Sequence, residues 1–160
     1  MPTRTQAPPE QFEAWVSFLR AHAALTRELS AQLLRDHGLT INDYEVLLHL
    51  SREEGGMLRR VDLAERVILT ASGITRLLDG LERQGFVEKA NCETDARVTY
   101  AKLTDAGRRK LRDAGKTHLA GIDELFLSRY SGSELATLAD LLSRLPMTGG
   151  DCDSKPISCA

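Results

Sequence analysis

Residues 10–145 contain no proline, and this gap narrows the possible folds more than any other feature of the sequence. The five prolines stand at positions 2, 8, 9, 146 and 156. Because proline removes a backbone donor and clashes with the preceding turn, it breaks helix interiors, and a long proline-free stretch permits long helices. The chain is therefore expected to be mainly helical between its two ends.

Apolar residues at three- and four-residue steps predict the first two helices. The first spans residues 10–36, between a proline pair and a glycine, a start and a stop that are typical of a helix. The second begins after Thr40, which can cap it together with Asp43, and ends before Glu54.

Two shorter helices follow, and the second of them is the best defined in the sequence. They are predicted over residues 60–67 and 71–84. Thr70 can cap the start of the second, and Gly85 suits the left-handed position after its end. One face of this helix carries the i, i+3, i+4, i+7 stripe of a helix packed on a core: Ile74, Leu77, Leu78 and Leu81.

After this helix the spacing of apolar residues changes from the helical period to the two-residue alternation of a β-strand. Residues 86–89 and 98–103 are typical of two short strands, and the polar segment between them, 90–97, is too long for a tight turn. A hairpin with a protruding tip is therefore predicted.

Helices resume after the hairpin. One is capped by Thr104 and runs to about Tyr130, and the last starts from a capping box of Ser131 and Glu134. Residues 147–160 have no period and are expected to form a disordered tail.

Helix, capped helix and hairpin in this order are the arrangement of a winged helix-turn-helix. We predict a mainly α fold with six helices and a two-stranded β-hairpin wing. The segments are an N-terminal helix at 10–37, the winged module at 38–104, two C-terminal helices at 105–146 and the tail.

The exposed face of helix 71–84 carries small and polar side chains. Ser, Thr and Arg can bond to base edges and phosphates, and Ala and Gly let a backbone approach closely, so this face suits a DNA major groove. An amphipathic helix always exposes a polar face, so a merely solvated surface stays equally open. The candidate contacts are Thr70, Ala71, Ser72, Gly73, Thr75 and Arg76.

The net charge does not favour nucleic acid. Lys and Arg number 21 against 23 Asp and Glu, and residues 40–110 hold 12 of each sign, so any DNA site must depend on local charge. Arg59 and Arg60, before the first short helix, and Lys102, at the base of the wing, are further candidates. For the two arginines an ordinary charged surface is equally open.

Five short motifs in a fixed order carry a family likeness. They are Leu63-Ala64-Glu65-Arg66, TASGITRLLDGL at 70–81, GFVEK at 85–89, Asp95-Ala96-Arg97 and LTDAG at 103–107. Each motif alone is weak, but the ordered set, continuous from about residue 38 to 111, resembles the MarR family of transcription regulators.

That resemblance implies a sequence-specific regulator of double-stranded DNA, most often a repressor. In the family, the Arg of the Asp-x-Arg wing motif reaches the minor groove and the Asp orients it, which implies these roles for Arg97 and Asp95. Two departures stand out: Ala96, where many members have a basic residue, and Gly80, where Arg or Lys is common.

The resemblance also implies an obligate homodimer whose first and last helices interleave. The apolar stripes of those helices support this independently, because the small winged module cannot cover them all. Twofold symmetry then predicts a pseudo-palindromic operator with half-sites about 34 Å apart.

Many family members respond to small aromatic acids bound between the dimer helices and the winged domain. An aromatic wall with a cationic donor suits such a ligand. For Trp15 and Tyr44, a place in the core is the stronger interpretation. The candidate residues are Trp15, Arg20, His22, Tyr44 and His49.

Two alternatives stay open. Oxidation of Cys92 in the wing would make the chain a redox-sensing regulator, although a passive thiol is favoured. A winged helix can also serve as a protein-interaction module, which an acidic chain would fit. Arg97 together with Thr75 and Arg76 argues for DNA, because an interaction module would not need that arrangement.

Other classes of function are not expected. Cys152 and Cys159 have no partner at metal-ligand spacing, so no metal or other cofactor is assigned. The four histidines are scattered and the sequence has no phosphate loop or nucleophile elbow, so no enzyme is predicted. A chain without a long apolar run, a signal segment or a disulfide framework is expected in a reducing cytoplasm and not in a membrane.

Overall fold

Six helices and three short strands make up the described part of the chain. The structure is a computed structural model and describes residues 8–67, 69–91 and 99–146. The elements in order are α1 Pro9–His37, α2 Ile41–Arg52, β1 Met57–Arg59, α3 Arg60–Arg66, α4 Ala71–Arg83, β2 Val87–Asn91, β3 Thr99–Leu103, α5 Asp105–Leu125 and α6 Gly132–Ser143, with 3-10 turns at Glu54–Gly56 and Leu127–Arg129.

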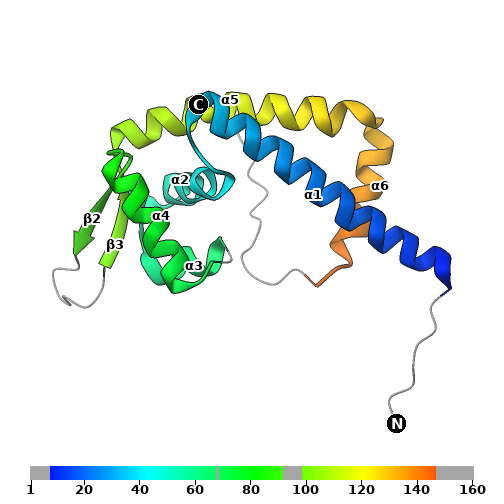
Figure 1. The fold of residues 1–160 in the computed structure, drawn as a ribbon, viewed down its shortest axis with the longest axis horizontal. Coiled ribbons are helices and arrows are strands. Elements are labelled where there is room, and N and C mark those ends of the chain that lie inside the picture. The colour runs from blue at the N-terminus through cyan, green and yellow to red at the C-terminus, as the bar shows by residue number, and fades with distance from the viewer. Residues whose placement is uncertain (1–7, 68, 92–98, 147–160) are drawn as a thin grey trace, which may run out of the picture.

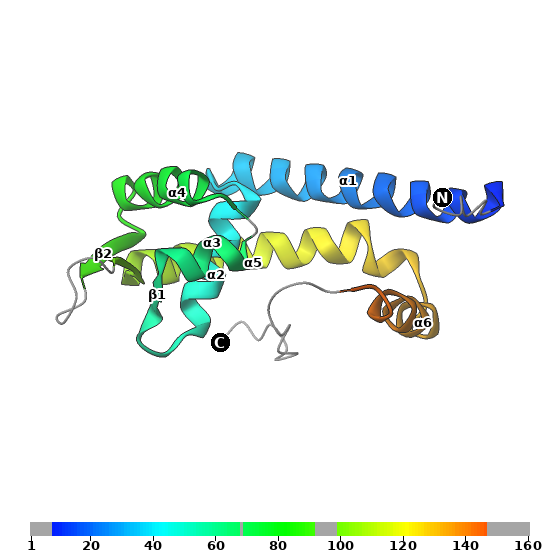
Figure 2. The same ribbon diagram turned by 90° about the horizontal axis from the view of Figure 1, so that it is seen from below.

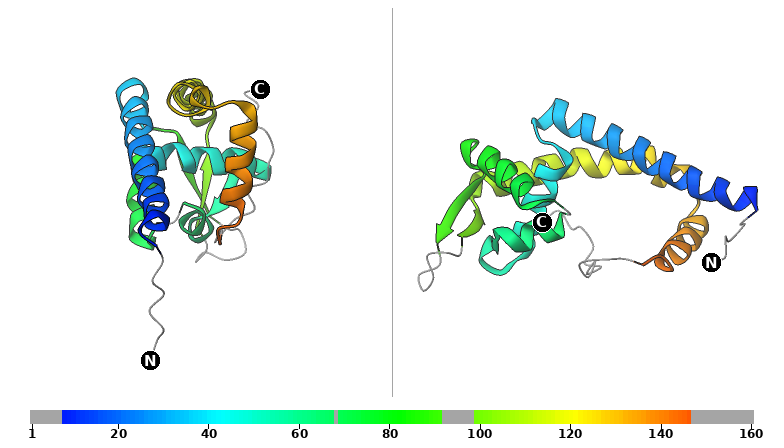
Figure 3. Two further views of the ribbon diagram at one scale, coloured as in Figure 1. Left: turned by 90° about the vertical axis from the view of Figure 1, so that its right-hand side faces the viewer. Right: turned by 60° about the horizontal axis from the view of Figure 1, so that its bottom comes forward.

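Two long helices, α1 and α5, lie side by side and form the spine of the molecule (Figures 1 and 2). The helices α2, α3 and α4 and the sheet gather at one end of this spine, and α6 lies at the other end. Viewed from that second end, α1 and α6 flank α5 (Figure 3). Within the described ranges, no helix is both long and apolar enough to cross a bilayer.

The predicted N-terminal caps are confirmed. In each, a Ser or Thr hydroxyl accepts a hydrogen bond from the backbone N–H three residues later, which satisfies one of the free donors of the first turn. The pairs are Thr40 with Asp43 (3.2 Å), Thr70 with Gly73 (3.1 Å), Thr104 with Gly107 (3.0 Å) and Ser131 with Glu134 (3.4 Å). The first and last of these are full capping boxes, which the sequence predicts for Ser131 and Glu134.

The sheet corrects one prediction, because it has three strands and not two. The strand order is β1-β3-β2, all antiparallel, with β3 in the middle. Leu58 of β1 faces Ala101 of β3, and both side chains are buried. A strand of three residues is too short to show an alternating apolar pattern, so periodicity does not predict β1.

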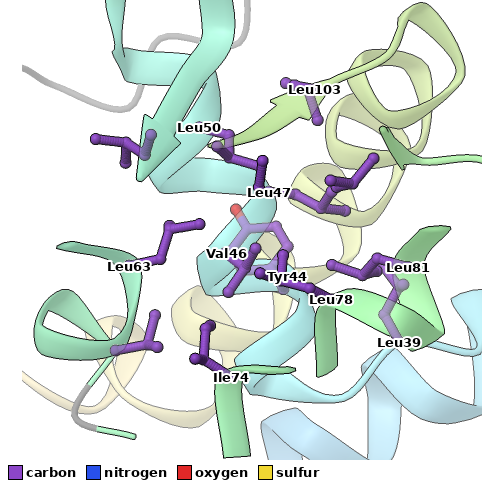
Figure 4. Packing of buried hydrophobic residues seen from close by; sticks show 14 of the residues in the cluster. Leu39, Tyr44, Val46, Leu47, Leu50, Leu63, Ile74, Leu78, Leu81 and Leu103 are labelled. Carbon is purple, nitrogen blue, oxygen red and sulfur yellow. The ribbon is translucent and has the colours of Figure 1, made fainter. Parts of the chain in front are cut away.

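The core is a single apolar cluster inside the winged module (Figure 4). Helix α2 supplies its centre, with side chains that point towards α3, α4 and β3. The long helices contribute little to this cluster, chiefly Leu33 of α1 and Ala114 of α5. Other members are Leu39, Tyr44, Val46, Leu47, Leu50, Leu63, Ile74, Leu78, Leu81 and Leu103. At the end that carries α6, away from the winged module, α1 and α5 therefore have no apolar core of their own among the described residues.

Helix α5 ends five residues earlier than predicted. Phe126 has φ −130° and ψ −63°, outside the helical region, and a 3-10 turn follows before α6 begins. The Phe126 and Tyr130 rings meet edge to face across this turn, 5.5 Å apart. Apolar residues stay at helical spacing through the break, so periodicity alone could not locate it.

Candidate nucleic-acid interface

Helix α4 exposes the small and polar face that the sequence predicts. Ile74, Leu78 and Leu81 are buried on its inner side, while Ala71, Ser72, Thr75 and Arg76 are exposed. The hydroxyls of the first turn are held locally: Thr75 Oγ1 donates to the Ala71 carbonyl at 2.9 Å, and Thr70 and Ser72 lie 3.2 Å apart. The start of α4 thus presents short side chains and no bulky obstruction.

Arg76 is an exposed cation on the N-terminal half of this face. Among the described residues, no ion pair within 4 Å involves it. It lines an open hollow of about 550 Å³ together with Asp79, Glu82 and Arg83. An exposed, unpaired guanidinium can donate two hydrogen bonds in one plane, as recognition of guanine or a phosphate requires.

The two arginines at the start of α3, Arg59 and Arg60, both form ion pairs with carboxylates of the winged module. Arg59 forms a two-bond ion pair with Asp62, with both N–O distances 2.8 Å, and this hydrogen bonding raises the pKa of Arg59. Arg60 donates to Glu82 of α4 at 3.0 Å, and only 19% of its side chain is exposed. Arg60 therefore does not stand open to a phosphate as Arg76 does.

The base of the wing shows the same pairing of charges. Lys102 of β3 lies directly opposite Glu88 of β2, with 2.8 Å between Nζ and the carboxylate. Both side chains are about half exposed, so this pair adds little stability and Lys102 can exchange partners. The wing candidates Asp95 and Arg97, with Cys92, lie outside the described residues.

The candidate ligand residues of α1 are all exposed. Trp15, Arg20 and His22 lie on the distal half of this helix, and the rings of Trp15 and His22 lie 6.3 and 6.5 Å from Phe18. Trp15 is 56% exposed, so the expected core position is not found in a single chain.

The two candidates on α2 lie elsewhere. Tyr44 is buried, as its core interpretation predicts. Its ring lies tilted against that of His118 of α5, with 4.7 Å between the ring centroids, and burial lowers the pKa of His118. His49 is half-buried, and its pKa is lowered by burial and then by Arg66 and Arg52. Within the described part of the chain, the structure therefore does not gather the five ligand candidates into one pocket.

Sequence reasoning missed Glu82, which accepts from Arg60 of α3 and from Lys89 of β2. Arg60 and Glu82 are 22 residues apart, and no helical or twofold period links such a pair. Only the packing of α3 against α4 reveals it.

Comparisons with known proteins decide the family. The family model described as MarR family matches residues 37–98. AbsC, a MarR family transcriptional regulator from Streptomyces coelicolor with a known crystal structure, shares 33% sequence identity with this chain. The two structures superpose with a TM-score of 0.77 over 88% of this chain and 93% of AbsC. This chain belongs to the MarR family. The resemblance carried by the five motifs is thereby confirmed, and so is the winged helix-turn-helix fold.

Two further relatives of this MarR family protein agree. Sco3205, a MarR family regulator from Streptomyces coelicolor solved in complex with DNA, is 26% identical with a TM-score of 0.83, over 89% of each chain. The transcriptional regulator MhqR from Bacillus subtilis is 25% identical over 146 residues, 91% of this chain and 98% of its own. The protein is thus a transcription regulator with a DNA-binding winged helix.

Proposed function

We propose that this MarR family chain is a cytoplasmic repressor that binds a pseudo-palindromic operator as a homodimer, with α4 in the major groove. The observation that carries the proposal is the exposed start of α4, where the short side chains of Ala71, Ser72 and Thr75 precede Arg76, a cation with no ion-pair partner among the described residues. A major groove admits one helix whose N-terminal residues touch base edges. Sco3205, which shares this fold, was solved with DNA.

Paired cations make the rest of the module a modest phosphate binder. Arg59, Arg60, Lys89 and Lys102 all have carboxylate partners within 4 Å. Each cation that leaves its partner for a phosphate gives up one ion pair for another, so the net gain per contact is small. Sequence discrimination therefore depends mainly on α4 and, by the family resemblance, on Arg97.

Removing the Arg76 side chain tests this docking. Arg76→Ala and Thr75→Ala are each expected to cost about 1–3 kcal/mol of operator binding and to reduce discrimination between sequences. Arg97→Ala is expected to weaken binding to all duplexes. Quantitative footprinting on the region upstream of the protein's own gene measures all three.

The matched control is Arg144→Ala, which removes the same charge from α6, far from α4. It is expected to leave the footprint unchanged. Footprints unchanged in all three interface variants would contradict this docking.

The repressor is further proposed to be released by a small aromatic acid. This part rests on the family resemblance, because the five ligand candidates do not meet in a single chain. Stabilisation of the protein in a thermal-shift screen of phenolic acids supports it, and the absence of any shift at saturating ligand would contradict it.

A further inference from the structure

One carboxylate, that of Glu82, joins three elements of the DNA-binding module. Arg60 of α3 donates to its Oε1 at 3.0 Å, and Lys89 of β2 lies 3.1 Å from its Oε2. Glu82 itself is in the last two turns of α4. The Arg60 and Glu82 side chains are each only 19% exposed, so this pair is far better shielded from water than the wing pair of Glu88 and Lys102.

Because of its position, this carboxylate can set the orientation of α4 relative to α3 and the wing. Only residues 84–86 separate α4 from β2, and Gly85 turns there with φ +74°. Arg60 directly follows β1 in the chain, so a contact to Arg60 also constrains the position of this edge strand. Glu82 thus ties together the helix that would enter the groove, the helix before it and the base of the wing.

We propose that Glu82 is a positioning residue for sequence recognition. Its two oxygens hold α4 at a fixed angle to α3 and to β2, so that the α4 face and the wing fit one operator together. Arg60 acts through Glu82 and not as a phosphate contact. The proposal rests on the proposed DNA-binding function and adds the element that sets its selectivity.

Simple electrostatics makes the opposite prediction for the loss of this charge. Removing a carboxylate from a DNA-binding module lowers repulsion and leaves Lys89 with the longer, 3.7 Å pairing to Asp79, which would strengthen binding to every duplex. Loss of positioning weakens binding to the operator only, because binding to unrelated DNA depends on charge and not on a shared geometry. The ratio of operator to non-specific affinity therefore separates the two effects.

The experiment compares Glu82→Gln with Glu88→Gln. Both remove one negative charge from a side chain paired to a wing lysine, but only Glu82 also binds Arg60. The probes are the duplex that the unmodified chain selects from a random-sequence library and a shuffled duplex of equal length. For Glu82→Gln the affinity ratio is expected to fall about tenfold while non-specific affinity holds or rises. For Glu88→Gln the ratio is expected to stay unchanged.

A double-mutant cycle shows whether Arg60 and Glu82 act through each other. Arg60→Met is expected to lower the ratio, and adding Glu82→Gln to it is expected to cause little further loss. Arg60→Lys, which keeps the charge, is expected to retain most of the selectivity. A merely structural pair would change thermal stability and leave the ratio of the folded protein unchanged.

Two results would overturn the inference and leave the proposed function standing: an unchanged ratio in Glu82→Gln, or fully additive losses in the cycle. An unmodified chain that selects no duplex at all would overturn the proposed function, and this inference with it.

Discussion

Replacing Gly107 with alanine is expected to lower the free energy of unfolding by about 3 kcal/mol, near the upper end of the usual cost of overpacking. A Cβ at this position would clash with the carbonyl oxygen of Phe86 and lie 2.7 Å from Leu103 Cδ1. The Phe86 carbonyl cannot simply move away, because it accepts the backbone N–H of Thr104 at 3.1 Å. The glycine of the LTDAG motif is thus required by the close approach of α5 to the base of the wing.

The control for this prediction is Gly80→Ala in α4. A Cβ at Gly80 would meet nothing within 4 Å, so this glycine is not required by packing. Alanine there is expected to raise the free energy of unfolding by about 1 kcal/mol through helix propensity. Urea unfolding of both variants at one protein concentration measures the two effects. A Gly107→Ala protein as stable as the parent would contradict the packing described here.

The double variant Trp15→Glu with Leu19→Glu is expected to turn the proposed homodimer into a monomer. Helix α1 exposes a set of large apolar side chains that no part of the described chain buries, each between 40% and 56% exposed: Phe12, Trp15, Val16, Phe18 and Leu19. Helix α6 lies at the same end of the molecule as the start of α1 (Figure 3) and has no buried residue. Leu141 in this helix and Leu145 just after it are nearly half exposed. Exposed apolar surface of this size is typical of an interface.

Two unpaired carboxylates in such an interface would oppose association strongly. Burying even one polar group without a partner costs a few kcal/mol, so association is expected to weaken by about a hundredfold or more. Sedimentation equilibrium measures the change. Val61→Glu, which puts a charge on an apolar side chain of α3 that is 61% exposed, is expected to leave the dimer intact. A double variant that sediments as the parent does would show that the partner binds elsewhere.

The helices could be predicted from the sequence because their determinants are local. A hydroxyl at position 40, 70, 104 or 131 and an apolar stripe behind it are enough to fix the start and the inner face of a helix. The exposed face of α4 followed from the same stripe, since residues opposite Ile74 and Leu78 must face outwards.

What could not be predicted depends on contacts between distant residues. Strand β1 forms because its backbone pairs with β3, and its three residues are too few to show a periodic pattern. The pairing of Arg60 with Glu82 requires α3 to pack on α4, and from sequence alone Arg60 was as reasonable a phosphate contact as Arg76. The neutral charge count has a related explanation, because many of the module's cations are already paired within the chain.

Selection of DNA by the purified chain tests whether the protein recognises one operator sequence as a homodimer. The unmodified protein is incubated with a random-sequence duplex library, and the bound DNA is sequenced. The molecular mass of the protein–DNA complex is then measured. The predicted result is one enriched, twofold-symmetric site with half-sites about one helical turn apart, bound by two copies of the chain. No enrichment over the input library, or an asymmetric site bound by a single copy, would contradict the account.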